Sequence, residues 1–262
     1  MDLGISGKGA LVLASSRGLG LGVARALVAE GARVVITGRH ADKLAEAAAS
    51  LNAAGPGSAA WIETDFSAEG AALNLAEAAT ERLGTVDILV NNTGGPPPGS
   101  VLAVSPDIWD AQFAAMVRNL FTITAALVPP MRQRGWGRIL TLASSGVVQP
   151  IPNLGISNAL RSALIGWSKT LSDEVAGDGV TANVLLPGRI HTERVDELDA
   201  ATAKRTGKPV AEVAAASQAA VPVGRYGRVE EFAACAAFLV SGPASYVTGS
   251  VLRCDGGAIR SV

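Results

Sequence analysis

The sequence predicts a single α/β domain of the Rossmann type, in which helices cover both faces of a doubly wound parallel sheet of about seven strands. Three observations predict it. Short apolar runs rich in β-branched residues alternate along the chain with stretches of helical periodicity. A glycine-rich turn follows the first apolar run and leads into a helical pattern. The chain has 262 residues, enough to bury one sizeable core, so we expect one domain over residues 1–262.

The apolar runs are the predicted strands, and the helical stretches between them are the crossovers that parallel strands need. Right-handed crossovers bring the loops after the strands to one edge of the sheet, where a doubly wound fold binds its ligand. We therefore expect functional residues to follow strand ends. The predicted strands are 10–14, 34–37, 59–63, 88–90, 139–142, 181–186 and 251–253.

The turn after the first strand has the composition of a phosphate-binding loop. Its sequence is Ser15-Ser16-Arg17-Gly18-Leu19-Gly20-Leu21-Gly22. Glycines let the backbone bend sharply and let its N–H groups approach an anion with no side chain in the way. Val23, Leu27 and Val28 then recur at helical spacing, so the positive end of a helix dipole would point back at the turn. A tight strand-to-helix connection is the alternative, but the second strand after the helix favours nucleotide binding.

One segment, residues 191–223, interrupts the alternation of strands and helices. It is polar and rich in alanine, and it follows a strand end. Long excursions at a ligand-binding edge are often lids, so we interpret this segment as a lid or substrate loop. A helical insertion on the surface is the alternative.

The charge balance and the apolar runs argue against several classes of partner. The 22 basic and 23 acidic side chains give a net charge of −1, which offers nucleic acid or an anionic membrane no attraction. No apolar run approaches the roughly 18 residues of a membrane span, and Met1-Asp2-Leu3-Gly4 lacks the basic and apolar regions of a secretory signal. We expect a cytoplasmic protein that acts on a small-molecule substrate and binds neither nucleic acid nor membrane.

The two cysteines show no metal-ligand spacing. Cys235 lies within an apolar helical pattern, and Cys254 lies near the C-terminus. Buried reduced thiols account for both residues, so we expect neither a disulfide nor a metal site.

Further motifs follow the predicted strands. Asp65 follows the third strand, Asn91-Asn92-Thr93-Gly94 the fourth, and Pro187-Gly188-Arg189-Ile190-His191-Thr192 the sixth. Together with the glycine-rich turn and in this order, these motifs resemble those of the short-chain dehydrogenase/reductase family over essentially the whole chain. The family has glycine at Ala14 and alanine at Thr93. The resemblance implies that Asp65 stands where family members hold the adenine ring, and that the Pro-Gly segment lies at the nicotinamide end.

The resemblance implies a nicotinamide cofactor, and a charge argument selects which one. A carboxylate at the end of the second strand binds the ribose hydroxyls of NAD and repels the extra phosphate of NADP. This chain has Thr37-Gly38-Arg39-His40 there, and Arg17 and Arg39 could both bind a 2′-phosphate. We therefore predict NADP(H) in preference to NAD(H), although a solvated loop arginine would also account for Arg39. The implied cofactor-binding residues are Ser15, Ser16, Arg17, Gly18, Leu19, Gly20, Arg39, Asp65, Phe66, Asn91, Thr93, Gly94, Arg161, Pro187, Gly188, Ile190 and Thr192.

The family's reaction passes a hydride between nicotinamide and a carbonyl or alcohol carbon, and it uses four side chains. A tyrosine delivers the proton, a lysine four residues later lowers the tyrosine pKa, a serine polarises the substrate oxygen and an asparagine orders a water. The segment 137–144 aligns the serine with Ser144. The segment 163–169 aligns the tyrosine with Ser157 and the lysine with Arg161, and the asparagine position holds Met116.

These substitutions change the chemistry that the site can do. An aliphatic hydroxyl such as that of Ser157 is far less acidic than a phenol, and an arginine holds its proton too tightly to transfer it. The only two tyrosines, Tyr226 and Tyr246, belong to C-terminal segments that match the family on their own. We predict that Ser144, Ser157 and Arg161 form the reacting end of an atypical member.

The predicted function is an atypical NADP(H)-dependent oxidoreductase that transfers hydride between nicotinamide and a small carbonyl or alcohol substrate. His191 is the alternative proton donor, although a surface or capping histidine would account for it too. Glu193 could orient His191, but an ordinary carboxylate at a helix start is the favoured interpretation of Glu193. The alternative function is a non-catalytic NADP(H)-binding protein that acts as a sensor or a structural subunit. The resemblance also implies a homodimer or homotetramer, in which the helices around 109–134 and 157–174 pack across a two-fold axis.

Overall fold

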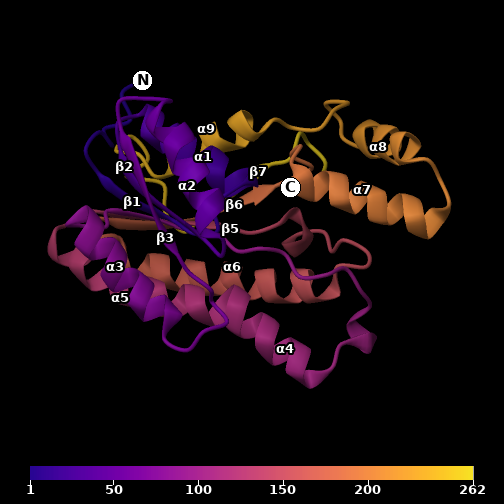
Figure 1. The fold of residues 1–262 in the computed structure, drawn as a ribbon, viewed down its shortest axis with the longest axis horizontal. Helices are drawn as coiled ribbons and strands as arrows, with labels where there is room; N and C mark the ends of the chain where they lie inside the picture. The colour runs from indigo at the N-terminus through magenta and orange to yellow at the C-terminus, as the bar shows by residue number, and fades with distance from the viewer. Residues whose placement is uncertain (262) are drawn as a thin grey trace.

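The computed structural model describes residues 1–261. All seven predicted strands are present in it: β1 (Gly9–Val12), β2 (Arg33–Gly38), β3 (Ser58–Glu63), β4 (Ile88–Asn91), β5 (Gly137–Leu142), β6 (Val180–Pro187) and β7 (Val251–Cys254). They form one parallel sheet with the order β3-β2-β1-β4-β5-β6-β7, so the direction of the crossovers reverses between β1 and β4. Helices cover both faces of this sheet, which confirms the predicted fold (Figure 1).

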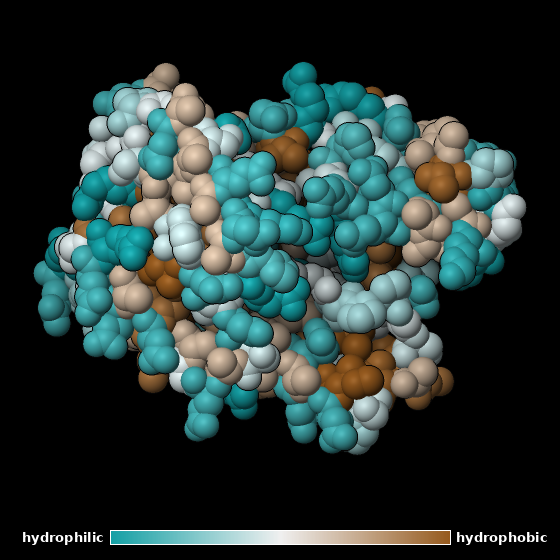
Figure 2. All heavy atoms as spheres, in the orientation of Figure 1, coloured by the Kyte–Doolittle hydropathy of each residue, from teal (hydrophilic) through white to brown (hydrophobic). Residues whose placement is uncertain are grey.

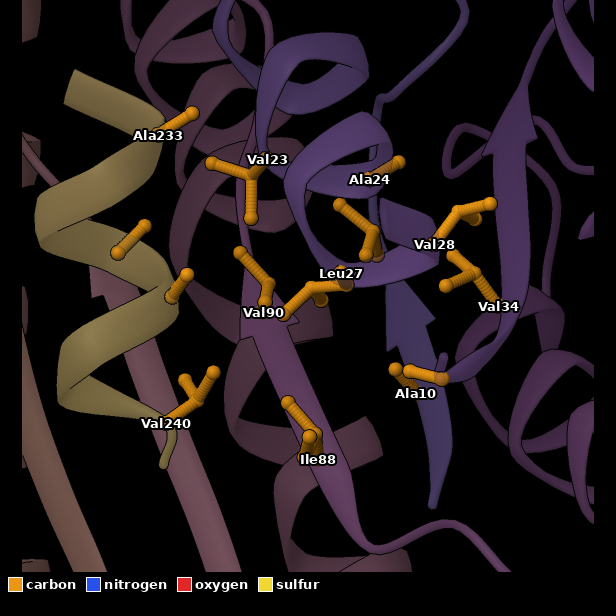
Figure 3. Close-up of a cluster of buried hydrophobic side chains, with 14 of the residues drawn as sticks. Ala10, Val23, Ala24, Leu27, Val28, Val34, Ile88, Val90, Ala233 and Val240 are labelled. Carbon is orange, nitrogen blue, oxygen red and sulfur yellow. The ribbon is translucent and has the colours of Figure 1, made fainter. Parts of the chain in front are cut away.

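A hydrophobic core fills the space between the sheet and the helices on each of its faces. In the first core, Val23 and Leu27 of the helix after β1 point toward Val90 of β4 and the helix that carries Ala233 (Figure 3). The helical spacing of Val23, Leu27 and Val28 is therefore confirmed. The helices of this face are α1 (Gly18–Ala29), α2 (Ala41–Asn52) and α9 (Val229–Leu239), and those of the other face are α3 (Ala71–Leu83), α5 (Asn119–Gln133) and α6 (Gly155–Val175).

Three further helices lie at the margins of these two layers. The helix α4 (Pro106–Phe113) continues through a π-helical segment, Ala114–Arg118, into α5. The helices α7 (Glu193–Thr206) and α8 (Val210–Ala219) extend beyond the end of the sheet (Figure 1). Residues 191–223 thus form mainly a pair of helices, and their role as a lid stays a prediction.

The reversal between β1 and β4 brings together two loops that are far apart in the sequence. The amide of Leu13 donates to the carbonyl oxygen of Val90 at 3.0 Å, just before both loops begin. A doubly wound fold binds its ligand at such a reversal, beyond the carboxyl ends of the strands. The glycine-rich turn and the Asn91-Asn92-Thr93-Gly94 segment both lie there.

The continuous helical run 106–133 is long and apolar enough to cross a membrane by length and composition alone. This finding corrects the expectation that no apolar run approaches that length. Within the fold, Leu120, Ile123 and Leu127 of the run are buried in the core beside the sheet. The core helix of a folded domain passes the same test, so the run is weak evidence for membrane insertion.

Cys235 on α9 and Cys254 at the end of β7 are free thiols that are only partly buried, whereas the sequence predicts full burial. Burial, followed by the neighbouring Cys235, raises the pKa of the Cys254 thiol to about 12. Cys254 therefore stays protonated and unreactive at neutral pH.

The strand β1 ends two residues earlier than predicted because Ala14 departs from strand geometry. Its φ is +46°, in the left-handed region that residues other than glycine rarely adopt. Its carbonyl oxygen accepts a hydrogen bond from Asn92 Nδ2 at 3.1 Å. Glycine, which the family has at this position, would adopt the same conformation without strain.

We expect Ala14→Gly to stabilise the protein by about 0.5 to 1 kcal/mol, because the strain that it relieves exceeds the entropy that glycine adds to the unfolded chain. Ala10→Gly, in the extended part of the same strand, is the matched control and should destabilise the protein. Denaturant unfolding measures both effects. A lower free energy of unfolding for Ala14→Gly than for the natural chain would contradict the explanation.

Candidate active site

The turn between β1 and α1 leaves no room for a side chain at Gly20. A Cβ atom on Gly20 would lie 2.7 Å from the carbonyl oxygen of Ala14 and 2.9 Å from Asn92 Nδ2. Gly18 has a φ of +60°, which favours glycine. Arg17 is the N-cap of α1 and makes no side-chain cap bond within the described residues, so the first helical amides stay available. This geometry suits a phosphate group.

Hydrogen bonds of Ser15 connect the turn to the ends of β1 and β2. Its Oγ donates to the carbonyl oxygen of Val12 at 2.6 Å and accepts from the amide of Thr37 at 3.0 Å. Thr37 Oγ1 in turn accepts from the amide of Ala14 at 3.1 Å. Ser15 is fully buried, and Leu19 packs against the core, so both residues position the turn from the protein side.

Ser16 and Arg39 lie at the end of β2, where the second phosphate of NADP is predicted. A Cβ atom on Gly38 would lie 3.2 Å from Ser16 Oγ, so the serine hydroxyl reaches this strand end. Hydrogen bonds from Ser67 lower the pKa of the Asp65 carboxyl, and the positive charge of Arg39 lowers it further. Arg39 and Asp65, both predicted to face the adenosine end of the cofactor, are therefore neighbours.

Two buried polar atoms at and just after the end of β4 lack a hydrogen-bond partner in the part of the chain that the structure describes. Asn91 Nδ2 donates to Thr124 Oγ1 at 3.0 Å, whereas Asn91 Oδ1 and Thr93 Oγ1 have no hydrogen-bond partner among residues 1–261. Buried polar atoms are normally paired, so these atoms are candidates to bind water or a ligand. The carbonyl oxygen of Phe66, on the loop after β3, accepts a hydrogen bond from Asn119 at 2.8 Å.

The Pro-Gly segment, which starts at the end of β6, reaches the glycine-rich turn. The amide of Gly188 donates to the carbonyl oxygen of Cys254 at 2.9 Å, and Ile190 is buried. Thr192 Cγ2 lies 4.0 Å from the position that a Cβ atom of Gly18 would take. The structure thus brings two predicted cofactor-binding segments into contact across more than half of the chain.

Arg17 lies next to two glutamates of the 191–223 segment. Its guanidinium forms an ion pair with Glu193, and Glu197 Oε1 lies 3.7 Å from Arg17 Nη1. All three side chains are about half or more exposed, and exposed ion pairs contribute little stability. A phosphate group can therefore replace the glutamates as the partner of Arg17.

His191 lines a cavity that is separate from the predicted reacting end. Its Nε2 is 3.2 Å from Asp196 Oδ1, and Tyr226 lines the same cavity. None of the three residues predicted at the reacting end is among the described residues that line this cavity. Glu193 is the first residue of α7, which confirms the favoured interpretation of a carboxylate at a helix start. The alternative, that Glu193 orients His191, is wrong, because Glu193 pairs with Arg17 and Asp196 lies next to the histidine.

The predicted reacting end gathers at the carboxyl end of β5. Ser144 Oγ accepts a hydrogen bond from the amide of Gly146 at 3.1 Å and caps a short 3-10 turn. The proton of the Ser144 hydroxyl is therefore available for a hydrogen bond to a ligand. Ser157 and Arg161 are buried and lie one turn apart on α6, so they share a face of the helix that packs on this turn.

The Arg161 guanidinium joins three elements. Its Nη1 donates to the carbonyl oxygen of Leu142 at 3.1 Å, and its Nη2 donates to that of Thr93 at 3.3 Å. No carboxylate among residues 1–261 forms an ion pair with it. Burial, followed by the positive charge of Arg194, lowers the pKa of Arg161 to about 10, so it remains a cation at neutral pH.

The residue at the predicted asparagine position and the two tyrosines lie in other environments. Met116 is buried in the core, and Tyr246 is fully exposed. The Tyr226 hydroxyl donates to Asp199 Oδ2 at 2.5 Å, and burial raises its pKa. Neither tyrosine is placed to act for Ser157.

Arg194 lies on α7 close enough to Arg161 for its charge to act on it, and the sequence did not indicate it as a site residue. Its Nη2 donates to the carbonyl oxygen of Pro96 at 3.0 Å, in the loop after β4. This contact joins residues 98 positions apart, so no local pattern marks it. The proximity of Arg194 to Arg161 therefore follows from the fold alone.

The strand order and the residues at the sheet edge define a Rossmann-type α/β protein with a candidate dinucleotide site. Known proteins are similar over the whole chain. A family model described as enoyl-(acyl carrier protein) reductase matches residues 13–258. The 3-oxoacyl-(acyl-carrier-protein) reductase FabG of Salmonella typhimurium is 35% identical over 257 residues, which cover 97% of this chain and 98% of that protein.

Two further comparisons agree. The D-beta-hydroxybutyrate dehydrogenase of Cupriavidus necator is 33% identical over 259 residues, which cover 97% of this chain and 98% of that protein. The structure of L-sorbose reductase from Gluconobacter frateurii, in complex with NADPH and L-sorbose, superposes with a TM-score of 0.94 at 32% identity and covers 100% of both chains. The chain therefore belongs to the short-chain dehydrogenase/reductase family, a family of oxidoreductases.

Proposed function

We propose that the chain is an NADPH-dependent carbonyl reductase, an atypical member of its family in which Ser144, Ser157 and Arg161 form the reacting end. The observation that carries this proposal is that Arg161 joins three elements of the fold. Its guanidinium binds the carbonyl oxygens of Leu142 and Thr93, so α6, the end of β5 and the loop after β4 meet at the ligand edge of the sheet.

Three features support NADPH over NADH. The strand β2 ends at Gly38 and is followed by Arg39, without a carboxylate, and Ser16 Oγ lies beside Gly38. Arg17 has only exposed glutamates as charged partners among the described residues, and a phosphate can replace them. Hydroxyl and guanidinium groups bind phosphate through charge-assisted hydrogen bonds. The similar L-sorbose reductase was solved with NADPH bound, which supports the same choice.

When bound, the nicotinamide supplies the hydride. Ser144 Oγ accepts a hydrogen bond from Gly146, so its own proton is available for the substrate carbonyl oxygen. Ser157 offers a second hydroxyl, and Arg161 holds a positive charge near the oxygen on which negative charge develops. Because a serine hydroxyl is a much weaker acid than a phenol, the final proton comes from solvent.

The second candidate function is a non-catalytic NADPH-binding protein, either a sensor or a structural subunit. The residues Ser157 and Arg161, at the positions predicted for tyrosine and lysine, favour it. Both candidates use the same cofactor site, so they differ only in turnover. NADPH oxidation with a panel of ketones and aldehydes, and NADP⁺ reduction with the matching alcohols, distinguishes them. We expect slow, saturable turnover; its absence in both directions would overturn the reductase and support the second candidate.

Ser144→Ala should lower kcat/KM by about 100-fold or more, because it removes a positioned donor to the substrate oxygen. The Kd for NADPH should stay unchanged, which fluorescence titration checks. Ser145→Ala, which removes the adjacent hydroxyl, is the matched control and should have little effect. An equal loss of activity in the two variants would remove Ser144 from the reacting end.

The surface near α4 supports a homodimer or homotetramer. Hydrophobic side chains gather over this region in Figure 2, and Leu102, Ile108 and Phe113 are exposed there. A second copy of the chain would remove this apolar surface from water. Light scattering should give twice or four times the mass of one chain, and the mass of a single chain would refute the proposal.

A further inference from the structure

We infer that the site takes a carbonyl substrate that carries its own carboxylate, and that Arg161 and Arg194 bind this carboxylate beside the reacting carbonyl. The inference rests on the proposed function and specifies its substrate class. It starts from a positive charge that the protein itself leaves without a counter-ion.

The arginines around the site outnumber the carboxylates that face them. Glu193 pairs with Arg17. Glu197 Oε2 lies 3.1 Å from Arg194 Nη1, and Glu197 also lies 3.7 Å from Arg17, so two arginines share it. Arg161 has only backbone carbonyl oxygens as partners among residues 1–261. One positive charge therefore remains at the reacting end.

This remaining charge lies where water compensates it poorly. Arg161 is only 8% exposed, and an unpaired charge in such a place is unfavourable. The phosphates of NADPH are predicted at the glycine-rich turn and at Arg39, away from the reacting end. The substrate is then the molecule that can supply the missing negative charge.

Both arginines contact the loop after β4, which is exposed at two glycines. Gly94 and Gly95 are exposed, and a Cβ atom on Gly94 would meet no described atom within 4 Å. On one side, Arg161 Nη2 lies 3.5 Å from the carbonyl oxygen of Gly94. On the other side, Arg194 Nη2 lies 3.5 Å from the position that a Cβ atom of Gly95 would take. The two guanidinium groups therefore border the same exposed segment, Gly94-Gly95, where a small anion has room.

A carboxylate matches this space in charge and in size. Guanidinium groups bind carboxylates through charge-assisted hydrogen bonds, and the buried Thr93 hydroxyl has no partner among the described residues and offers a further donor. The ion pair of Arg194 with Glu197 is exposed, so an entering anion can displace Glu197. Because Arg161 lies one turn from Ser157, the carboxylate and the reacting carbonyl belong to one short oxo acid.

Reduction of matched acids and esters tests the inference. The pairs are 2-oxobutanoate, 3-oxobutanoate and 4-oxopentanoate, each against its methyl ester, with NADPH as the reductant. We expect at least one acid to exceed its ester in kcat/KM by about tenfold or more, the size of a charge-assisted hydrogen bond. Equal or faster reduction of all three esters would overturn the inference and leave the proposed reductase intact.

Two variants and one unreactive ligand complete the test. Arg194→Gln should bring the ratio of acid to ester close to one, whereas Arg205→Gln, at the far end of α7, should leave the ratio unchanged. Glutarate should bind the NADPH-loaded protein in calorimetry, dimethyl glutarate should not, and Arg194→Gln should abolish the binding. If nothing is reduced but glutarate binds in this pattern, the anion site stands and the proposed reductase falls. Absence of glutarate binding together with absence of reduction would overturn both.

Discussion

The double variant Ser157→Tyr with Arg161→Lys should reduce carbonyl substrates about 100-fold faster than the natural chain, or faster still, which is the usual contribution of a positioned general acid. A phenol next to a lysine can give up its proton to the developing alkoxide, whereas the Ser157 hydroxyl cannot. Ser144 keeps its bond from the Gly146 amide in the variant, so the carbonyl stays polarised. Steady-state kinetics with a saturating carbonyl substrate measures the gain.

The matched control for this gain is Ser157→Phe with Arg161→Lys. It has the same ring and the same lysine but no hydroxyl, so it separates proton delivery from changes in packing on α6. Thermal unfolding of both variants shows whether they fold equally well. If the tyrosine variant is no faster than the phenylalanine variant, Ser157 does not stand at the position of the proton donor.

Arg39→Ala should weaken NADPH binding by about tenfold to a hundredfold, because it removes charge-assisted hydrogen bonds to the 2′-phosphate. NADH has no such phosphate, so its affinity should stay the same. Fluorescence titration of the variant with each cofactor measures the two values. The expected result is a loss of preference for NADPH without a loss of the cofactor site.

Arg33→Ala is the matched control for this effect. Arg33 lies at the other end of β2, where its Nε donates to the carbonyl oxygen of Gly7, so it carries the same charge on the same strand far from the ligand edge. We expect the variant to bind NADPH like the natural chain. Equal losses for Arg33→Ala and Arg39→Ala would reveal a general effect of net charge and contradict a phosphate contact at Arg39.

The strands could be predicted from the sequence because buried parallel strands need continuous apolar, β-branched runs. The end of β1 could not be placed, because Ala14 adopts a left-handed conformation that its identity does not announce. The surrounding contacts impose it, including the bond from Asn92 to the Ala14 carbonyl oxygen. Local propensity carries no information on a contact between residues 78 positions apart.

At the site too, local sequence indicates the segments, whereas contacts between distant residues could not be predicted. The glycine-rich turn and the Pro-Gly segment have compositions that a close backbone approach requires, so the sequence indicates them. The ion pair between Arg17 and Glu193 joins residues 176 positions apart, and no motif contains both. The position of Glu193 at a helix start could be predicted, but its partner Arg17 could not, and neither could the place of Asp196 next to His191.

The most direct test of the account is a titration of the purified protein with NADPH and, in parallel, with NADH, followed by nicotinamide fluorescence. The account predicts saturable binding of NADPH with a Kd about tenfold or more below that of NADH. Equal affinity for both cofactors would contradict the phosphate site at Ser16 and Arg39, and no binding of either would contradict the cofactor site as a whole.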